Sequence, residues 1–134
     1  MNPFRLDERL AQDTIAVTEL PLSRLLLMDD SRYPWFILVP RRAGLVELGD
    51  LDDSELAVLM GEIVAVQRTI SKAFAPDKVN VGALGNIVRM LHIHLVARRI
   101  GDPAWPGPVW GQGAAVRYSP AMAQMVIDKF HGGL

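Results

Sequence analysis

Apolar residues recur at helical spacing between residues 53 and 74, and this is the clearest pattern in the chain. Asp52 stands where an N-cap belongs, and Glu55 follows three residues later, as in a capping box. Pro76 cannot continue a helix because it lacks an amide donor. We therefore predict one long helix over Asp53–Phe74. Its apolar positions are Leu56, Leu59, Met60, Ile63, Ile70 and Phe74.

Several runs have the β-branched and aliphatic composition of strands. Pro21 separates the first two runs, and Pro40 ends the third, which is continuously apolar and therefore predicts a buried central strand. A turn at Ala83–Gly85 precedes the last and longest run. The predicted strands are Thr14–Leu20, Leu22–Met28, Trp35–Val39, Lys78–Gly82 and Ile87–Ala97.

The two ends of the chain predict shorter helices. Leu6–Ala11 has the composition of a short helix, and Ser119-Pro120 provides an N-cap followed by proline for a final helix that reaches about Phe130. The Pro- and Gly-rich tract Gly101–Pro108 predicts a loop. A meander of strands with one long helix and a C-terminal helix indicates an α+β fold, and we expect residues 1–134 to form a single domain.

Composition narrows the function classes. The 134 residues are 50% hydrophobic with a formal net charge of −1, which is typical of a globular protein and does not favour binding to nucleic acid. The absence of cysteine excludes disulfides and thiolate chemistry. No secretory signal and no run of about 18 apolar residues is present, so we expect a cytoplasmic protein without a membrane partner.

Candidate chemistry lies in the last predicted strand. Because side chains alternate across a strand, His92 and His94 share one face with Val88, Met90 and Val96, about 6.5–7 Å apart along the strand. Two interpretations other than catalysis are open: ordinary strand histidines on a half-solvated face, or two ligands of a metal site. The metal interpretation lacks a third ligand, because the next carboxylate, Asp102, lies beyond the strand. We therefore predict no metal site.

The segment Met90–Arg98 resembles the histidine triad (HIT) motif, in which three histidines alternate with hydrophobic residues and two more hydrophobics follow. Leu95 and Val96 supply the trailing pair, so His94 corresponds to the third histidine, His92 to the second and Met90 to the first. The resemblance extends to Phe36–Arg42, to the long helix and to Asn80-Val81-Gly82. Three positions depart from the family pattern: Met90, Trp35 and Ala43 each stand where a histidine is common.

The resemblance implies a HIT-like fold and an activity. His92 would attack an α-phosphate to form a covalent nucleotidyl-histidine, oriented by the backbone carbonyl of Met90, and His94 would donate to the phosphate or leaving oxygen. Asn80 and Asn86 would hold phosphate oxygens. The implied substrates are purine nucleotides: nucleoside phosphoramidates, nucleotidyl esters or dinucleoside polyphosphates. The resemblance also implies a homodimer and no required cofactor, although a divalent ion such as magnesium could accompany the substrate.

Several assignments stay open. Asp30, beside Asp29, could bind the ribose or only form a turn, and Arg98 could face the phosphates or solvate the strand end. His131 is expected to be exposed near the C-terminus. Trp105 and Trp110 could cover the site, contact a second subunit or anchor their loop. The alternative function is a non-catalytic nucleotide-binding or interaction protein, but the presence of both His92 and His94 favours an enzyme.

Overall fold

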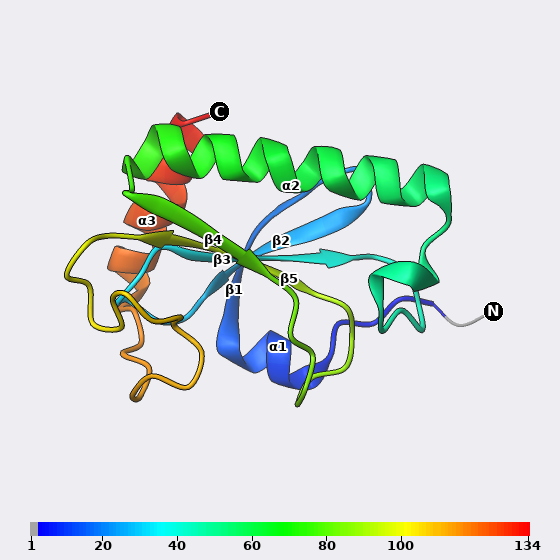
Figure 1. Cartoon of the computed structure of the whole chain (residues 1–134), viewed down its shortest axis with the longest axis horizontal. Coiled ribbons are helices and arrows are strands. Elements are labelled where there is room, and N and C mark those ends of the chain that lie inside the picture. The colour runs from blue at the N-terminus through cyan, green and yellow to red at the C-terminus, as the bar shows by residue number, and fades with distance from the viewer. Residues whose placement is uncertain (1–2) are drawn as a thin grey trace.

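Five antiparallel strands and three α-helices make up the computed structural model, which describes residues 3–134 (Figure 1). The elements follow one another along the chain as α1 (Glu8–Asp13), β1 (Thr14–Glu19), β2 (Ser23–Met28), β3 (Trp35–Pro40), a 3₁₀ turn (Leu48–Asp50), α2 (Asp53–Phe74), β4 (Lys78–Gly82), β5 (Ile93–Arg98) and α3 (Pro120–Gly132). The predicted α+β fold, with an antiparallel sheet, one long helix and a C-terminal helix, is confirmed.

The strand order in the sheet is β1-β2-β3-β5-β4. The first three strands form a meander, and β5 then lies between β3 and β4, pairing antiparallel with both. The outer strands β1 and β4 are the edges of the sheet. Every residue of β3 and of β5 is buried, so these two strands form its centre.

Helices α2 and α3 pack against one face of the sheet. Phe36 of β3 and Leu95 of β5 point to this face and lie in one core with Ile70 of α2 and Phe130 of α3. The rings of Phe36 and Phe130 are 4.8 Å apart. In Figure 1, α2 runs along one side of the sheet, and α1 lies on the opposite side.

The other face of the sheet has its own apolar layer. Trp35, Ile37 and Val39 alternate with the helix-facing residues of β3 and pack with Tyr33 and with Val96 of β5. Because both faces of β3 are covered, its sequence is continuously apolar instead of alternating. The predicted buried central strand is therefore confirmed.

The predicted strand Ile87–Ala97 is wrong at its start, because β5 begins only at Ile93. The ladders explain the difference: β4 ends with Gly82 opposite His94, and the pairing with β3 ends with Leu38 opposite Ile93, so no strand neighbour reaches further back. The preceding segment 83–92 is an irregular loop, in which Ile87 is 76% exposed.

The first helix is also displaced from its predicted position. It spans Glu8–Asp13 instead of Leu6–Ala11, because the Asp7 carboxylate caps it by accepting from the backbone N–H groups of Arg9 and Leu10. The loop predicted over Gly101–Pro108 is confirmed. Within residues 3–134, no helix has both the length and the apolarity that a membrane span needs.

The predicted bounds of the long helix are confirmed, and its start provides a test. Asp52 accepts from the Glu55 backbone N–H in a reciprocal capping box. We expect Asp52→Ala to lower the free energy of unfolding by about 1 kcal/mol, because the N–H groups of the first turn lose their acceptor. Asp53→Ala is the matched control, since Asp53 lies in the same turn without the capping position, and it should cost only a few tenths of a kcal/mol. Urea unfolding of both variants checks this, and equal losses would contradict it.

Candidate active site

Two histidines meet where the chain enters β5. His92 immediately precedes the strand, and His94 is its second residue, on the face of the sheet opposite α2 and α3. Their ring centroids are 4.9 Å apart, and the ring planes are steeply inclined to each other. The side chains are only 7% and 5% exposed. The two imidazoles therefore come together as predicted, but the prediction that both lie on the strand is wrong for His92, which lies just before it.

His92 is anchored by the backbone. Its Nδ1 lies 2.7 Å from the carbonyl oxygen of Met90. A carbonyl oxygen only accepts hydrogen bonds, so the proton of a neutral His92 ring resides on Nδ1. The Nε2 atom then carries a free lone pair.

His94 is held by aromatic side chains. The indole Nε1–H of Trp35 donates to Nδ1 of His94 at 2.9 Å, and the ring of Trp110 lies 5.3 Å from the imidazole. Burial, reinforced by the neighbouring His92, lowers the pKa of His94 from 6.5 to about 3. The His94 side chain is therefore neutral at physiological pH.

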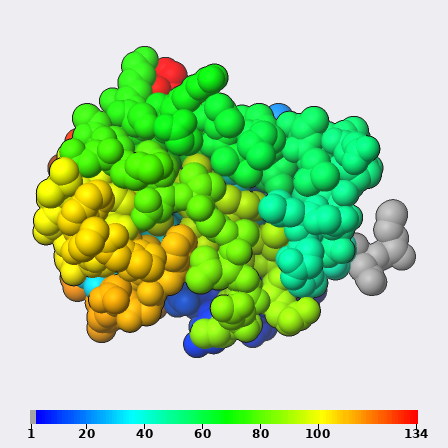
Figure 2. Space-filling view, viewed as in Figure 1, coloured from blue at the N-terminus to red at the C-terminus, as the bar shows by residue number. Residues whose placement is uncertain are grey.

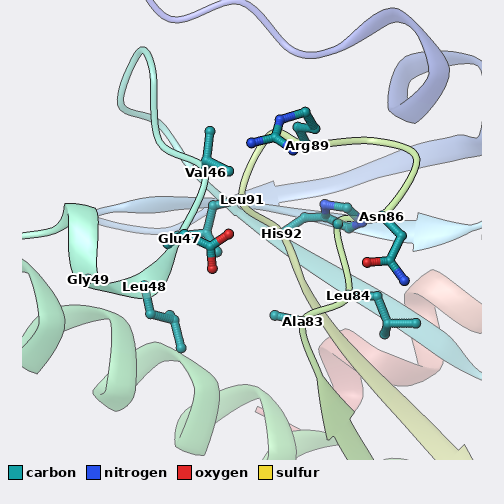
Figure 3. Close-up of a pocket in the computed structure, with 11 residues that line it drawn as sticks. Val46, Glu47, Leu48, Gly49, Ala83, Leu84, Asn86, Arg89, Leu91 and His92 are labelled. Atoms are coloured by element: carbon teal, nitrogen blue, oxygen red, sulfur yellow. The ribbon is translucent and has the colours of Figure 1, made fainter.

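A polar cavity of about 400 Å³ opens on one side of His92. Figure 3 shows the side chains of Glu47, Asn86, Arg89 and His92 around it. On the molecular surface, the yellow-green residues of the loop 83–92 lie between the blue-green segment before α2 and the orange loop before α3 (Figure 2). The walls of the polar cavity therefore come from two segments, residues 46–49 before α2 and residues 83–92 after it.

A second, more apolar cavity of about 410 Å³ adjoins the first at His92 and Asn86. His94 lines this cavity and not the polar one. Its apolar lining residues come from four segments of the chain and include Met28, Trp35, Ile87, Val88 and Trp110. The two imidazoles therefore lie where a polar and an apolar cavity meet.

Trp110 reaches this position because β4 ends in a glycine. Gly82 pairs with His94 across the ladder, and a Cβ added at Gly82 would lie 3.2 Å from the ring of Trp110. The absent side chain thus provides the room in which Trp110 packs beside His94. Trp105, the other tryptophan of this loop, lies instead over the guanidinium of Arg98.

The structure brings only some of the predicted site residues together. Asn86 lines both cavities with His92, and the Met90 carbonyl contacts His92. Asn80 and Arg98 lie elsewhere: the Asn80 side-chain oxygen accepts from Arg98 at 2.8 Å, and neither residue lines these two cavities.

The expectation that Arg98 faces phosphates or solvates the strand end needs correction. Its side chain is 1% exposed, forms an ion pair with Asp102 at 2.8 Å and lies over the rings of Tyr33 and Trp105. A buried guanidinium requires such a partner, because an unpaired charge would be costly to desolvate. Asp102 lies in a loop without periodicity, so its pairing with Arg98 could not be predicted from the sequence.

Asp30 is also buried, at 2% exposure, and not open to a ribose in this arrangement. It forms an ion pair with Arg32 and accepts from the Val116 N–H. Burial raises its pKa, but these hydrogen bonds and the charge of Arg32 more than offset that effect and hold the pKa below the usual value. Asp13, at the end of α1, is the carboxylate that lines the apolar cavity with the histidines.

Sequence reasoning did not identify Asp13, Arg9, Glu47 or Arg89 as site residues. Asp13 and Arg9 approach because α1 packs beside β1, and Glu47 and Arg89 lie in irregular segments without periodicity. His131 lies exposed on α3, with its ring 6.0 Å from that of Phe130, and it lines neither cavity. Among residues 3–134, no three histidine or acidic side chains are grouped so that they could hold a metal ion.

A five-stranded antiparallel sheet with a long helix and two contacting histidines where the chain enters β5 defines a protein of the histidine triad type. The HIT domain family matches residues 9–101, and the chain therefore belongs to this family. Proteins of the family are in general nucleotide-binding hydrolases and transferases.

Solved structures of histidine triad proteins share the fold over 98% or more of the chain. A protein from Sinorhizobium meliloti is 45% identical with a TM-score of 0.96, and the match covers 98% of this chain and 97% of that one. Proteins from Bradyrhizobium japonicum and Marinobacter aquaeolei are each 43% identical, with TM-scores of 0.95 and 0.96 and coverage of 97% or more of both chains. No curated protein matches the chain.

The low pKa of His94 predicts a pH-dependent stability. Below pH 6.5 the unfolded chain binds a proton at His94 that the folded chain does not bind until about pH 3. The free energy of unfolding is therefore unaffected by His94 above pH 6.5 and falls between pH 6.5 and 3, by up to about 1.4 kcal/mol per pH unit. In His94→Gln, which keeps an acceptor for Trp35, the stability lost between about pH 7 and 5 should be smaller by about 2 kcal/mol.

Urea unfolding at the two pH values measures this difference. His131→Gln is the matched control, because it removes an exposed histidine of the same type. An equal reduction in both variants would show that His94 is not the source of the pH dependence.

Proposed function

We propose that this chain cleaves a phosphate bond of a purine nucleotide through a covalent nucleotidyl-histidine on His92. The substrate is a nucleoside phosphoramidate, a nucleotidyl ester or a dinucleoside polyphosphate. The observation that carries the proposal is the hydrogen bond from His92 Nδ1 to the Met90 carbonyl, at 2.7 Å. This bond leaves the Nε2 atom with a free lone pair at the junction of the two cavities. A nucleophile needs such a lone pair.

The reaction has two steps. In the first, His92 Nε2 attacks the α-phosphorus, so that a phosphorus–nitrogen bond forms while the bond to the leaving group breaks and the leaving group takes up a proton from solvent. The ring then carries a positive charge, and its Nδ1–H remains bonded to the Met90 carbonyl. In the second step, water attacks the phosphorus, the phosphorus–nitrogen bond breaks and its electron pair returns to Nε2. The water loses a proton to solvent, the nucleotide departs and neutral His92 returns.

Met90 can act through its backbone alone. The first motif position contributes the carbonyl oxygen that orients His92, and a carbonyl is present whatever the side chain. The methionine side chain instead packs partly buried against the apolar layer around Trp35. We therefore propose that the reaction does not need an imidazole at position 90.

The residues around His92 are suited to transfer of a nucleotidyl group. His94 and Asn86 line the apolar cavity together with His92, and both can donate to phosphate oxygens, which is the positioning that this chemistry mainly requires. The apolar cavity with its two tryptophans suits a purine base, and the polar cavity with Arg89 suits the leaving group. No step needs a resident cofactor, and a magnesium ion could enter with a polyphosphate.

A trapped intermediate tests the assignment. Brief reaction with adenosine phosphoramidate or diadenosine polyphosphate should add one nucleotide to His92, seen by mass spectrometry as an acid-labile adduct, with AMP as the product. His92→Ala should remove the adduct, whereas His94→Ala should slow its formation.

His131→Ala is the control, because it removes the third histidine of the chain without touching either cavity. An adduct that persists in His92→Ala would refute the nucleophile. Nucleotide binding without any AMP release by the wild type would support the alternative, a non-catalytic nucleotide-binding protein.

The homodimer expected from the family resemblance is part of the same proposal. The edge strand β4 and the adjoining surface of α2 expose Met60 and Val81, at 59% and 49%, and they border an apolar groove of about 310 Å³. An uncovered sheet edge beside apolar surface favours pairing with a second copy. These residues would be buried if two β4 strands met.

Light scattering should give about twice the 14.8 kDa of one chain. Met60→Glu should shift the mass towards that of one chain, because a carboxylate would be buried at the interface. Met125→Glu is the matched control: Met125 is 69% exposed on α3 and does not line this groove, so its replacement should leave the dimer intact. A monomeric wild type at micromolar concentration would contradict the proposal.

A further inference from the structure

The hydrogen bond between Trp35 and His94 determines which His94 nitrogen carries the proton. An indole N–H can only donate, so His94 Nδ1, at 2.9 Å from it, must present a lone pair. A neutral imidazole has one proton, which therefore lies on Nε2 of His94. This is the opposite tautomer to that of His92, whose Nδ1–H faces the Met90 carbonyl.

The sheet fixes Trp35 in the position that makes this bond. Trp35 is opposite Val96 in the β3–β5 ladder, and His94 is opposite Ile37, so Trp35 and His94 are diagonal neighbours on one face. The Trp35 side chain is 6% exposed. Two other rings pack against it edge to face: that of Tyr33 at 6.3 Å and that of Trp110 at 6.5 Å.

We propose that Trp35 is a positioning residue of this site, which holds His94 in the Nε2–H tautomer so that it offers a neutral N–H donor beside the His92 nucleophile. Trp35 acts through His94 and need not contact the reacting atoms. The use of that donor on a phosphate oxygen rests on the proposed function, whereas the tautomer itself does not.

A neutral donor suits this location. The titratable side chain in contact with His94 is His92, and Arg9 and Asp13 line the same cavity from α1. A charged imidazolium at His94 would be desolvated beside a second imidazole that itself becomes positive when it binds phosphorus. The Trp35 bond provides a donor without that charge, because protonating Nδ1 would remove the acceptor of the buried indole N–H.

Nitrogen-15 NMR of the unmodified protein tests the tautomer directly. We expect His94 Nδ1 to resonate in the range of an unprotonated ring nitrogen and Nε2 in that of a protonated one, from about pH 5 to 8. A scalar coupling across the hydrogen bond should join Trp35 Nε1 to His94 Nδ1. A proton on His94 Nδ1 in the wild type would overturn the proposal.

Two matched tryptophan variants separate the hydrogen bond from ring packing. Trp35→Phe removes the donor, and we expect the Nδ1–H tautomer of His94 to become populated. Trp110→Phe shrinks the other ring beside His94, but Trp110 makes no hydrogen bond to it, so the tautomer should not change. If Trp35→Phe is folded by circular dichroism and keeps the wild-type tautomer, the proposal is refuted.

The catalytic consequence is measured separately. With a nucleotide substrate that the wild type turns over, Trp35→Phe should lower kcat by roughly tenfold with a smaller change in KM. The donor is lost at the reacting phosphate, while phenylalanine keeps an apolar ring in the cavity that Trp35 also lines. An unchanged kcat would overturn the role of the donor. If the wild type turns over no substrate, the proposed function fails while the NMR result still decides the tautomer.

Discussion

The placement of β5 between β3 and β4 is the constraint on which the rest of the structure depends. A strand with neighbours on both edges and layers on both faces buries all six of its residues. Three of them, Ile93, Leu95 and Ala97, face the helices and contribute only apolar contacts. The polar side chains His94 and Arg98 therefore share the opposite face, where each must find a hydrogen-bond partner out of reach of bulk water.

The two buried polar side chains obtain their hydrogen-bond partners in different ways. Arg98 is charged, forms an ion pair with Asp102 and donates to Asn80. His94 is neutral and accepts a hydrogen bond from Trp35. The difference follows from their intrinsic pKa values, since a guanidinium is always protonated while an imidazole is easily neutralised by burial. One end of β5 thus holds a structural ion pair, and the other end holds a neutral imidazole in contact with His92.

The sequence predicted the elements whose signals are local. The capped helix Asp53–Phe74 and the buried run Trp35–Val39 follow from periodicity and caps, and the alternation of His92 and His94 follows from strand geometry. The start of β5 could not be predicted, because it depends on where β3 and β4 cease to offer partners. The same limit applies to Asn80 and Arg98, whose mutual hydrogen bond joins two strands that are separated by a long loop.

The site itself is assembled from distant segments, and this explains how two similar residues acquire different roles. A His-x-His sequence contains two chemically equivalent imidazoles, and their contact at 4.9 Å does not distinguish them. Their Nδ1 atoms face groups of opposite character: a carbonyl oxygen at His92, which only accepts, and an indole N–H at His94, which only donates. The first group comes from the backbone two residues earlier and depends on no side chain, while the second requires a particular residue at the start of β3. The motif therefore supplies the two rings, and the surrounding fold determines the state of each Nδ1 atom. Nδ1 of His92 carries a proton, whereas Nδ1 of His94 carries a lone pair.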